Sequence, residues 1–344
     1  AGTRFAGKGV EFRADLVQAN RNGWRGRSGI SHFSRKMTIA GAEAFVPDNA
    51  VERTGLFTLQ SVELGSGFGI EAAGRIERAS VSARQIGFSR HFTLLSGAAG
   101  LAWEFAEGWK AGVNYTHGAR APSPEELLSD GAHVATQSYE LGDPGFGKET
   151  SNGVEATLSW RSARGELALT AYSTRFANFI AARPTGELRD DLPVFRYMQL
   201  PARYRGFEAS GSWQALDWGT GSLKLDAAAD YLRARLKNAG PAPRIPPLRL
   251  RGGAEWQQGA LHLRGEIEWN DAQNRVAAHE NPVRGFTLVN LSADWHPMGE
   301  QGPLTLLFSA DNLLDVVGRR AASFTRDFVP LSGRDLRVTA KLTF

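Results

Sequence analysis

The feature that most limits the fold of this sequence is an alternation of apolar and polar side chains in segments of about ten residues. In the last segment, apolar residues occupy every second position from Leu336 to Phe344, with Arg337 and Lys341 among the residues between them. Successive side chains of a β-strand point to opposite faces, so each segment predicts a strand with one apolar and one polar face. About fifteen such segments, each long enough to cross a bilayer when tilted, lie near 9–18, 25–40, 52–64, 68–79, 92–104, 109–121, 150–160, 166–182, 195–214, 221–236, 248–257, 261–270, 285–296, 303–313 and 335–344.

The connections between these segments alternate between short and long. The short ones include AEG, RSARG, QQGA and MGEQGP, and the long ones lie near 122–149, 183–194, 237–247, 271–284 and 314–334. A soluble β-sandwich gives no reason for every long loop to lie at one end, whereas an outer-membrane barrel has short periplasmic turns and long external loops. Aromatic residues at strand ends are expected beside the short turns, as an interfacial girdle: Trp103, Phe105, Trp160, Trp256, Trp269 and Trp295. The sequence therefore predicts an all-β fold, a transmembrane antiparallel β-barrel whose C-terminus lies at the periplasmic side.

Composition excludes several other classes of protein. The 344 residues include no cysteine, so disulfides and thiolate metal sites are ruled out. No run of about 18 apolar residues could form a membrane-spanning helix. The net charge of +4 is weakly basic, and no segment combines dense Lys and Arg with interleaved aromatics, so we expect no nucleic-acid partner. No nucleophile–base arrangement or HExxH spacing occurs, so we expect neither an enzyme nor a cofactor.

Several motifs resemble the barrel of TonB-dependent outer-membrane receptors. RAPSPEELLSDG (120–131) and GDPGFGKETSNGVEATL (142–158) resemble the family's R-x-P-S-x-x-E-L and G-N-P-x-L-x-x-E-x-S segments. Further similar stretches follow in the expected order: RGFEASGSW (205–213), RIPPLRLRGGAEW (244–256), FTLVNLSADW (286–295), FSADNLLD (308–315) and the terminal Phe344. The resemblance covers nearly the whole chain, and ADNLLD is its most specific motif.

The resemblance implies a barrel of about 22 strands, an N-terminal plug domain and a box that contacts the TonB complex. The sequence has about fifteen strand segments and neither plug nor box, so we expect residues 1–344 to be the C-terminal portion of the barrel. The plug and the first strands would belong to an N-terminal remainder of the receptor or to a separate chain. The implied function is import of a scarce nutrient across the bacterial outer membrane, with Phe344 read by the barrel-insertion machinery. A passive porin or structural barrel is the alternative from another class.

Two loops carry groups suited to a metal ion. Imidazole and carboxylate groups suit a divalent metal such as zinc, and they occur in GAHVATQSYELGD (131–143) and HENP (279–282). The first of these loops is similar to loops of receptors linked to zinc uptake. The candidate metal ligands are His133, Glu140, Asp143 and His279. A solvated polar loop is the simpler interpretation of the same residues.

Arginines at the edges of the long loops favour an anionic ligand, because guanidinium forks recognise carboxylate and phosphate. The candidate ligand-binding residues are Arg183, Arg196, Arg244 and Arg284, together with Tyr139. Such arginines suit a small metal chelate, and contact with the phosphates of lipopolysaccharide or outer-membrane lipid, or ordinary solvated charge, is the simpler interpretation of any single arginine. We expect the ligand to be a metal chelate such as a ferric siderophore, with zinc or another metal ion as the alternative.

Overall fold

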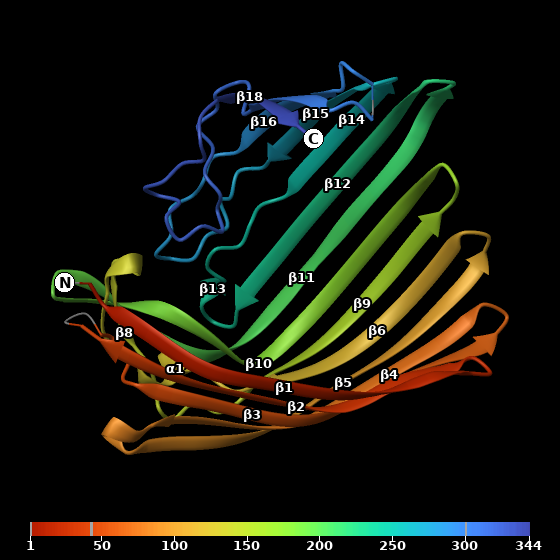
Figure 1. Ribbon diagram of the computed structural model, residues 1–344. Coiled ribbons are helices and arrows are strands. Elements are labelled where there is room, and N and C mark those ends of the chain that lie inside the picture. The colour runs from red at the N-terminus through yellow and green to blue at the C-terminus, as the bar shows by residue number, and fades with distance from the viewer. Residues whose placement is uncertain (1, 42–43, 300) are drawn as a thin grey trace.

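The computed structural model describes residues 2–41, 44–299 and 301–344, and it is almost entirely β-structure (Figure 1). Three of its 18 strands have four residues or fewer, which leaves fifteen long ones. Each predicted segment corresponds to one long strand, so the predicted all-β fold and strand positions are confirmed. The long strands are β1 (Arg4–Arg21), β2 (Trp24–Ala40), β3 (Asn49–Gly65), β4 (Phe68–Ala83), β5 (Phe88–Ala106), β6 (Trp109–Arg120), β9 (Glu149–Arg161), β10 (Gly165–Arg189), β11 (Leu192–Trp218), β12 (Gly221–Leu236), β14 (Arg249–Gln258), β15 (Leu261–Asn270), β16 (Phe286–Trp295), β17 (Leu304–Asp311) and β18 (Asp335–Leu342).

The remaining elements are short and lie in the connections: α1 (Pro124–Leu128), β7 (Asp130–His133), β8 (Ser138–Leu141), β13 (Gly240–Pro241) and the 3-10 turns Arg84–Ile86 and Val134–Thr136. Each long strand pairs antiparallel with the next long strand, including β6 with β9 and β12 with β14. The sheet curves into a barrel wall (Figure 1). Among the described residues β1 pairs only with β2 and β18 only with β17, so the sheet is not closed. No helix in the described part of the chain is long and apolar enough to cross a membrane.

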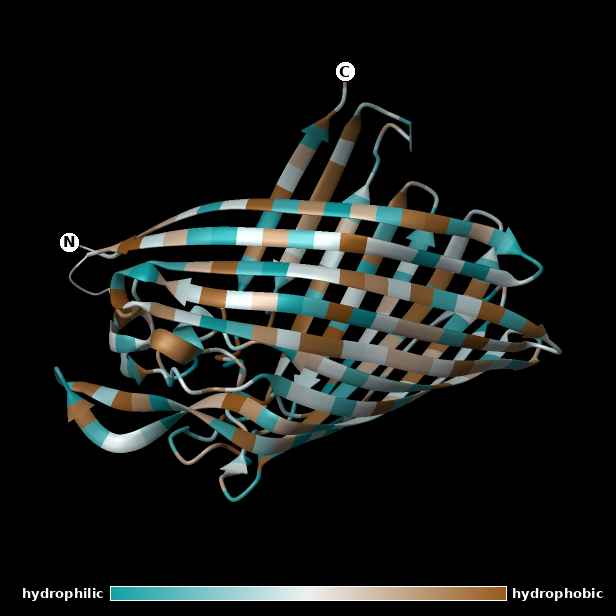
Figure 2. Cartoon of the chain, turned by 90° about the horizontal axis from the view of Figure 1, so that it is seen from below, coloured by the Kyte–Doolittle hydropathy of each residue, from teal (hydrophilic) through white to brown (hydrophobic). Residues whose placement is uncertain are grey.

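Hydrophilic and hydrophobic residues alternate along many of the strands (Figure 2), and because successive side chains of a strand point to opposite faces, the two faces of the wall have opposite chemistry. On β15, Leu263 and Ile267 are 40% and 55% exposed on the outer face. Arg264, between them, points into the lumen and donates to Asp226 of β12 at 2.6 Å and to Glu266 at 3.1 Å. Apolar side chains therefore face outward, and charged side chains pair with one another across the strands inside.

Short turns and long loops lie at opposite ends of the wall, as predicted, with two exceptions at the loop end. The first is the connection between β4 and β5, which is only four residues long (84–87). The second is at 183–194, where the predicted long loop is wrong, because β10 and β11 continue as a hairpin that projects beyond the other strands. Asp190 and Asp191 form its two-residue turn with φ of 51° and 59°, the left-handed backbone that tight hairpins require. The short strand β8 pairs in parallel with the projecting part of β11, which gives this extension a partner.

Aromatic rings form a belt beside the short turns on the outer face. Successive ring centroids from Phe68 to Trp213 are 5.2–6.1 Å apart, in the order Phe68, Trp103, Phe105, Trp109, Trp160 and Trp213. The prediction for Trp269 is wrong: it lies at the opposite end of β15, beside the loop that follows Asn270. A strand of ten residues begins at one membrane surface and ends at the other, so the aromatic near its end belongs to the other interface.

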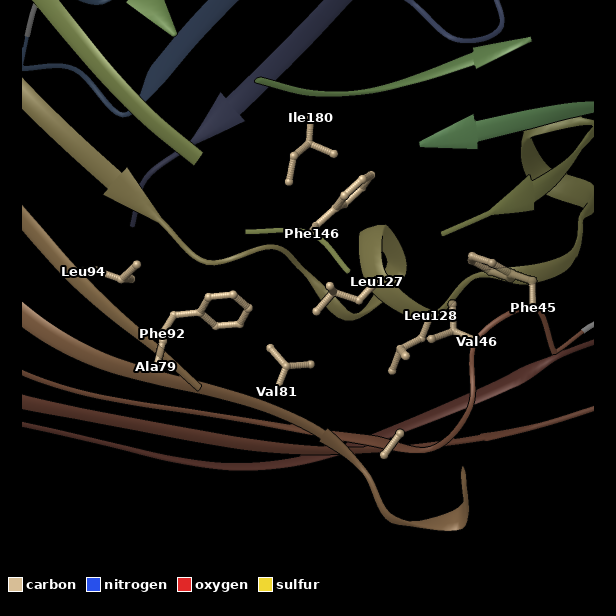
Figure 3. Packing of buried hydrophobic residues seen from close by; sticks show 11 residues of the cluster. Phe45, Val46, Ala79, Val81, Phe92, Leu94, Leu127, Leu128, Phe146 and Ile180 are labelled. Atoms are coloured by element: carbon tan, nitrogen blue, oxygen red, sulfur yellow. The ribbon is translucent and has the colours of Figure 1, made fainter. Parts of the chain in front are cut away.

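The main hydrophobic core lies inside the wall at the loop end (Figure 3). The β6–β9 connection folds inward, and Leu127 of α1 is fully buried there. It packs in one cluster with Val46 of the β2–β3 loop, Val81 of β4 and Phe92 of β5. Burying one such leucine side chain contributes about 1.5–3 kcal/mol. This core fixes the inward-folded loops, and the candidate site is built on them.

Candidate ligand-binding site at the loop end

A cavity of about 510 Å³ lies among the inward-folded loops, within the size range of small-molecule sites. The β6–β9 connection forms one side of it, and the loops after β12, β15 and β17 contribute others. Four predicted site residues line the cavity: His133, Glu140, Arg244 and His279. Aromatic side chains supply much of the rest of the lining, namely Phe45, Phe179, Phe195, Tyr197, Tyr204 and Phe324.

The β6–β9 connection is held in place by a capped helix and a partly buried ion network. Ser123 and Glu126 form a capping box at the start of α1, which satisfies backbone N–H groups of its first turn. Arg120, at the end of β6, pairs with Glu126 at 2.8 Å and with Glu149 of β9 at 2.9 Å. Glu149 also accepts from the backbone N–H of Ile180 at 2.9 Å. One arginine thus ties the helix to both strands that flank the connection.

His133 and Glu140, two of the candidate metal ligands, meet across the β7–β8 hairpin. The His133 Nδ1 lies 2.8 Å from the Glu140 Oε1. The imidazole stacks on Phe45 with centroids 4.2 Å apart and planes inclined by 13°. The other carboxylate oxygen of Glu140 accepts from the Tyr197 hydroxyl of β11 at 3.0 Å. This network connects the hairpin to the barrel wall and leaves the Glu140 side chain 10% exposed.

Asp143 and Tyr139 lie outside the cavity. The Asp143 carboxylate accepts from the backbone N–H of Gly145 at 2.8 Å and so stabilises its own turn. The Tyr139 hydroxyl donates to Asp130 at 3.0 Å, and the Arg189 guanidinium lies 5.3 Å from its ring centroid. Partial burial and the hydrogen bond to Asp130 raise the pKa of Tyr139. Both side chains serve local structure.

Three of the four predicted arginines also lie away from the cavity lining. Arg183 and Arg196 are register partners in the projecting β10–β11 hairpin, and Arg284 is exposed in the loop before β16. Arg244 is different. Its guanidinium stacks 3.8 Å above the Phe324 ring centroid, and it forms no ion pair within the described part of the chain. A charged, stacked and unpaired guanidinium can recognise an anionic ligand.

The buried ion pair between Glu280 and Arg326, which contacts the backbone of Arg244, was not identified from the sequence. Glu280 and Arg326 have side chains 7% and 5% exposed, with Nη2 and Oε1 3.4 Å apart. Glu280 also accepts from the backbone N–H of Arg244 at 2.8 Å, which holds Arg244 in its left-handed conformation with φ of 57°. Only the letters HENP and the arginine-rich loop before β18 pointed to these residues, and they lie far apart in the chain.

His279 lies at the cavity wall, edge-on to Phe195 with ring centroids 5.1 Å apart. Burial lowers the pKa of His279; Glu280 opposes that shift, and the positive charges of Arg244 and Arg183 add to it. The imidazole is therefore neutral at pH 7, with a lone pair available. Among the described residues, however, no three His, Cys, Asp or Glu side chains are grouped closely enough to hold a metal ion.

The fold and the cavity together define a class: a membrane-type barrel wall whose loops fold inward over a ligand-sized cavity. Residues 2–313 match the family model described as TonB dependent receptor-like, beta-barrel. The chain belongs to the TonB-dependent receptor β-barrel family, whose barrels lie in the bacterial outer membrane.

Solved structures of this family share the fold. The chain is similar to the copper transporter OprC, with a TM-score of 0.85 and 16% identity, covering 99% of this chain and 57% of that one. It is similar to the FrpB iron transporter from Neisseria meningitidis (F3-3 variant), with a TM-score of 0.77 and 15% identity over 99% and 55% of the two chains. The ferric-catecholate import receptor Fiu from K12 E. coli gives 0.75 and 13%, again over 99% and 55%. The chain thus spans just over half the length of these proteins.

Proposed function

We propose that residues 1–344 form the C-terminal portion of the barrel of a TonB-dependent transporter. The long loops and the cavity face the outside of the cell, and the short turns and the C-terminus face the periplasm. The N-terminal remainder of the receptor, in the same or a separate chain, supplies the missing strands and the plug on which the TonB complex pulls. The alternation of short turns and long loops supports this orientation.

The ligand we propose is an anionic metal chelate of the ferric-siderophore type. The observation that carries this proposal is Arg244, a guanidinium that forms no ion pair with a described residue and stacks on Phe324 in a cavity lined by aromatic rings. Guanidinium stays charged at every physiological pH and forms paired hydrogen bonds with carboxylates and similar anions. The neighbours Fiu and FrpB, described as a ferric-catecholate import receptor and an iron transporter, support the same ligand class.

A metal ion such as zinc or copper is the second candidate. The neutral His279 and the His133–Glu140 pair, which line the same cavity, favour it, because imidazole must be deprotonated to bind a metal. The neighbour OprC is described as a copper transporter. No group of three metal ligands exists among the described residues. A metal site therefore requires the β7–β8 hairpin, with His133 and Glu140, to move toward His279 when the ion binds.

Calorimetry on the complete receptor separates the two ligands. Arg244→Gln should weaken binding of a ferric siderophore about tenfold or more, the usual effect of losing a hydrogen bond from a charged group. Arg284→Gln removes the same charge outside the cavity and should leave the affinity unchanged. Zinc should give heat only if the second candidate is right, and that heat should disappear in a His133→Ala, His279→Ala double mutant.

Cellular uptake distinguishes both candidates from a passive porin. Uptake of a labelled chelate should stop when the TonB complex is deleted, because the barrel has no energy source of its own. Transport that continues at the same rate without TonB, or equal losses of affinity in Arg244→Gln and Arg284→Gln, would overturn the proposed function.

A further inference from the structure

Five arginines form a patch on the outer face of the wall near the loop end, which we name the outer arginine patch. Arg175 of β10 is the register partner of Arg203 of β11, and Arg203 is the partner of Arg235 of β12. Two positions closer to the short turns, Arg205 is the partner of Arg233. Directly paired residues of an antiparallel sheet lie on the same face. The three strands therefore carry two adjacent rows of positive charge.

Neighbouring residues show that this face is the outer one. Phe207, two positions from Arg205, is 41% exposed and is the register partner of Tyr231. The same face of β11 continues to Trp213 of the aromatic belt. On the opposite face, Ala202 and Leu236 are buried in a cluster inside the wall. A ligand in the loop-end cavity therefore lies on the other side of the sheet from the outer arginine patch.

None of the five arginines forms an ion pair with a described residue. The nearby carboxylate Asp230 faces the lumen and pairs there with Arg249. Like charges placed opposite one another across a sheet are destabilising. A cluster of this kind is stabilised when anions from outside the chain lie between the guanidinium groups.

The surface below and beside the patch is hollowed. A groove of about 530 Å³ begins at Arg205 and Arg233, and its sides include the apolar residues Val154, Ala171 and Phe207. A second hollow of about 230 Å³ lies between Arg233, Arg235, Arg275 and the loop after β12. The Arg275 guanidinium of the second hollow sits 5.6 Å from the ring centroid of Tyr231, which lines the groove. Cationic groups thus lie at the loop end, and an apolar channel extends from them toward the short turns.

We propose that the outer arginine patch binds the phosphorylated headgroup of a lipid in the outer leaflet, of the lipopolysaccharide type. The guanidinium forks bind the phosphates, and one acyl chain lies in the groove beside Phe207. A free phosphate ion would use the arginines alone and leave the apolar groove without a role. This inference rests on the proposed orientation, in which the long loops face outward, and it does not depend on which ligand occupies the loop-end cavity.

The test is lipid binding by the complete receptor, purified in a nonionic detergent, stripped of lipid and titrated with lipopolysaccharide under native mass spectrometry. The variant combines Arg203→Gln, Arg205→Gln and Arg233→Gln. One basic residue near an anionic membrane surface changes binding about fivefold, so three together should weaken binding roughly 100-fold. The single variants Arg205→Gln and Arg233→Gln should each weaken it about fivefold. Heat-modifiable migration in gels verifies that each barrel is folded.

A matched variant removes three positive charges at the other end of the wall: Arg25→Gln, Arg161→Gln and Arg164→Gln. It should bind lipopolysaccharide as the unchanged receptor does. Equal binding by the patch variant and the unchanged receptor would overturn the proposal. So would full displacement of the lipid by millimolar inorganic phosphate, or equal binding of phosphatidylcholine. Chelate binding is measured separately by calorimetry. The lipid-binding result can therefore be interpreted even if the proposed transport function is wrong.

Discussion

Replacing Ile267 with arginine tests the assignment of the lipid-facing surface. Ile267 lies on the outer face of β15, a strand of ten residues, 1.5 positions from its midpoint. At about 3.4 Å per residue and a tilt near 45°, its Cα lies within about 4 Å of the bilayer midplane. An arginine on the lipid face costs about 2–4 kcal/mol at that depth. Leu261, at the strand end, lies about 11 Å from the midplane by the same arithmetic, and Leu261→Arg should cost only about 0–1 kcal/mol.

The measurement is the free energy of unfolding of the complete receptor in lipid vesicles, obtained from reversible urea titrations. The lumenal neighbour Glu266 supplies the control, because it accepts from Arg264 at 3.1 Å and is partly exposed to the lumen. Glu266→Gln keeps the hydrogen bond and should change stability by less than about 1 kcal/mol. If Glu266→Gln costs as much as Ile267→Arg, or if Leu261→Arg costs as much as Ile267→Arg, the assignment of faces is refuted.

Three further predictions concern the lumen, the loops and the chain end. Arg264→Leu should destabilise the barrel by about 1–2 kcal/mol in the same titration, because it leaves Asp226 without its bidentate partner. The cost stays in this range because both side chains are partly exposed to water. The lowered pKa of His279 means that below pH 6.5 the unfolded chain binds a proton more readily than the folded loop does. After correction for the intrinsic rate at each pH, amide exchange in the loop 271–285 should therefore be faster at pH 5.5 than at pH 7.5, and equal corrected rates would contradict this. Deleting Phe344 should lower the amount of receptor in the outer membrane without changing ligand affinity, as quantified by blotting and calorimetry; unchanged amounts would remove its role in insertion.

The strands could be predicted from the sequence because lipid and a wet lumen impose the same alternation on every strand. Leu263 and Ile267 must be apolar on one face, and Arg264 and Glu266 can be charged on the other, whatever loops connect them. The alternation does not say at which end of a strand an aromatic residue lies. Trp269 was assigned to the wrong interface because an aromatic near a strand end marks a membrane surface without saying which of the two surfaces it is.

The loops could be predicted only in part, because their side chains are used by contacts that no local pattern encodes. Asp143 has the chemistry of a metal ligand, yet its carboxylate is taken by the backbone of its own turn. Arg183 and Arg196 border a segment rich in charge and turn formers, and the structure pairs them within a hairpin. His133 and Glu140, which lie in one predicted loop, are brought together by a short hairpin, and their role as metal ligands stays a prediction.

The distribution of ion pairs explains why Arg244 carries the proposed ligand site while its equally charged neighbour does not. Arg326 is neutralised by the buried Glu280, and that same carboxylate binds the backbone of Arg244 rather than its guanidinium. One carboxylate therefore positions Arg244 and leaves its charge uncompensated among the described residues. The arrangement repeats on the outside of the wall, where Arg205 and Arg233 also form no ion pair with a described residue and lie beside an apolar surface. In the loop-end cavity and in the outer arginine patch, a positive charge without a counter-ion among the described residues lies beside apolar surface. A ligand with an anionic group and an apolar part can pair with the charge and cover the apolar surface at the same time.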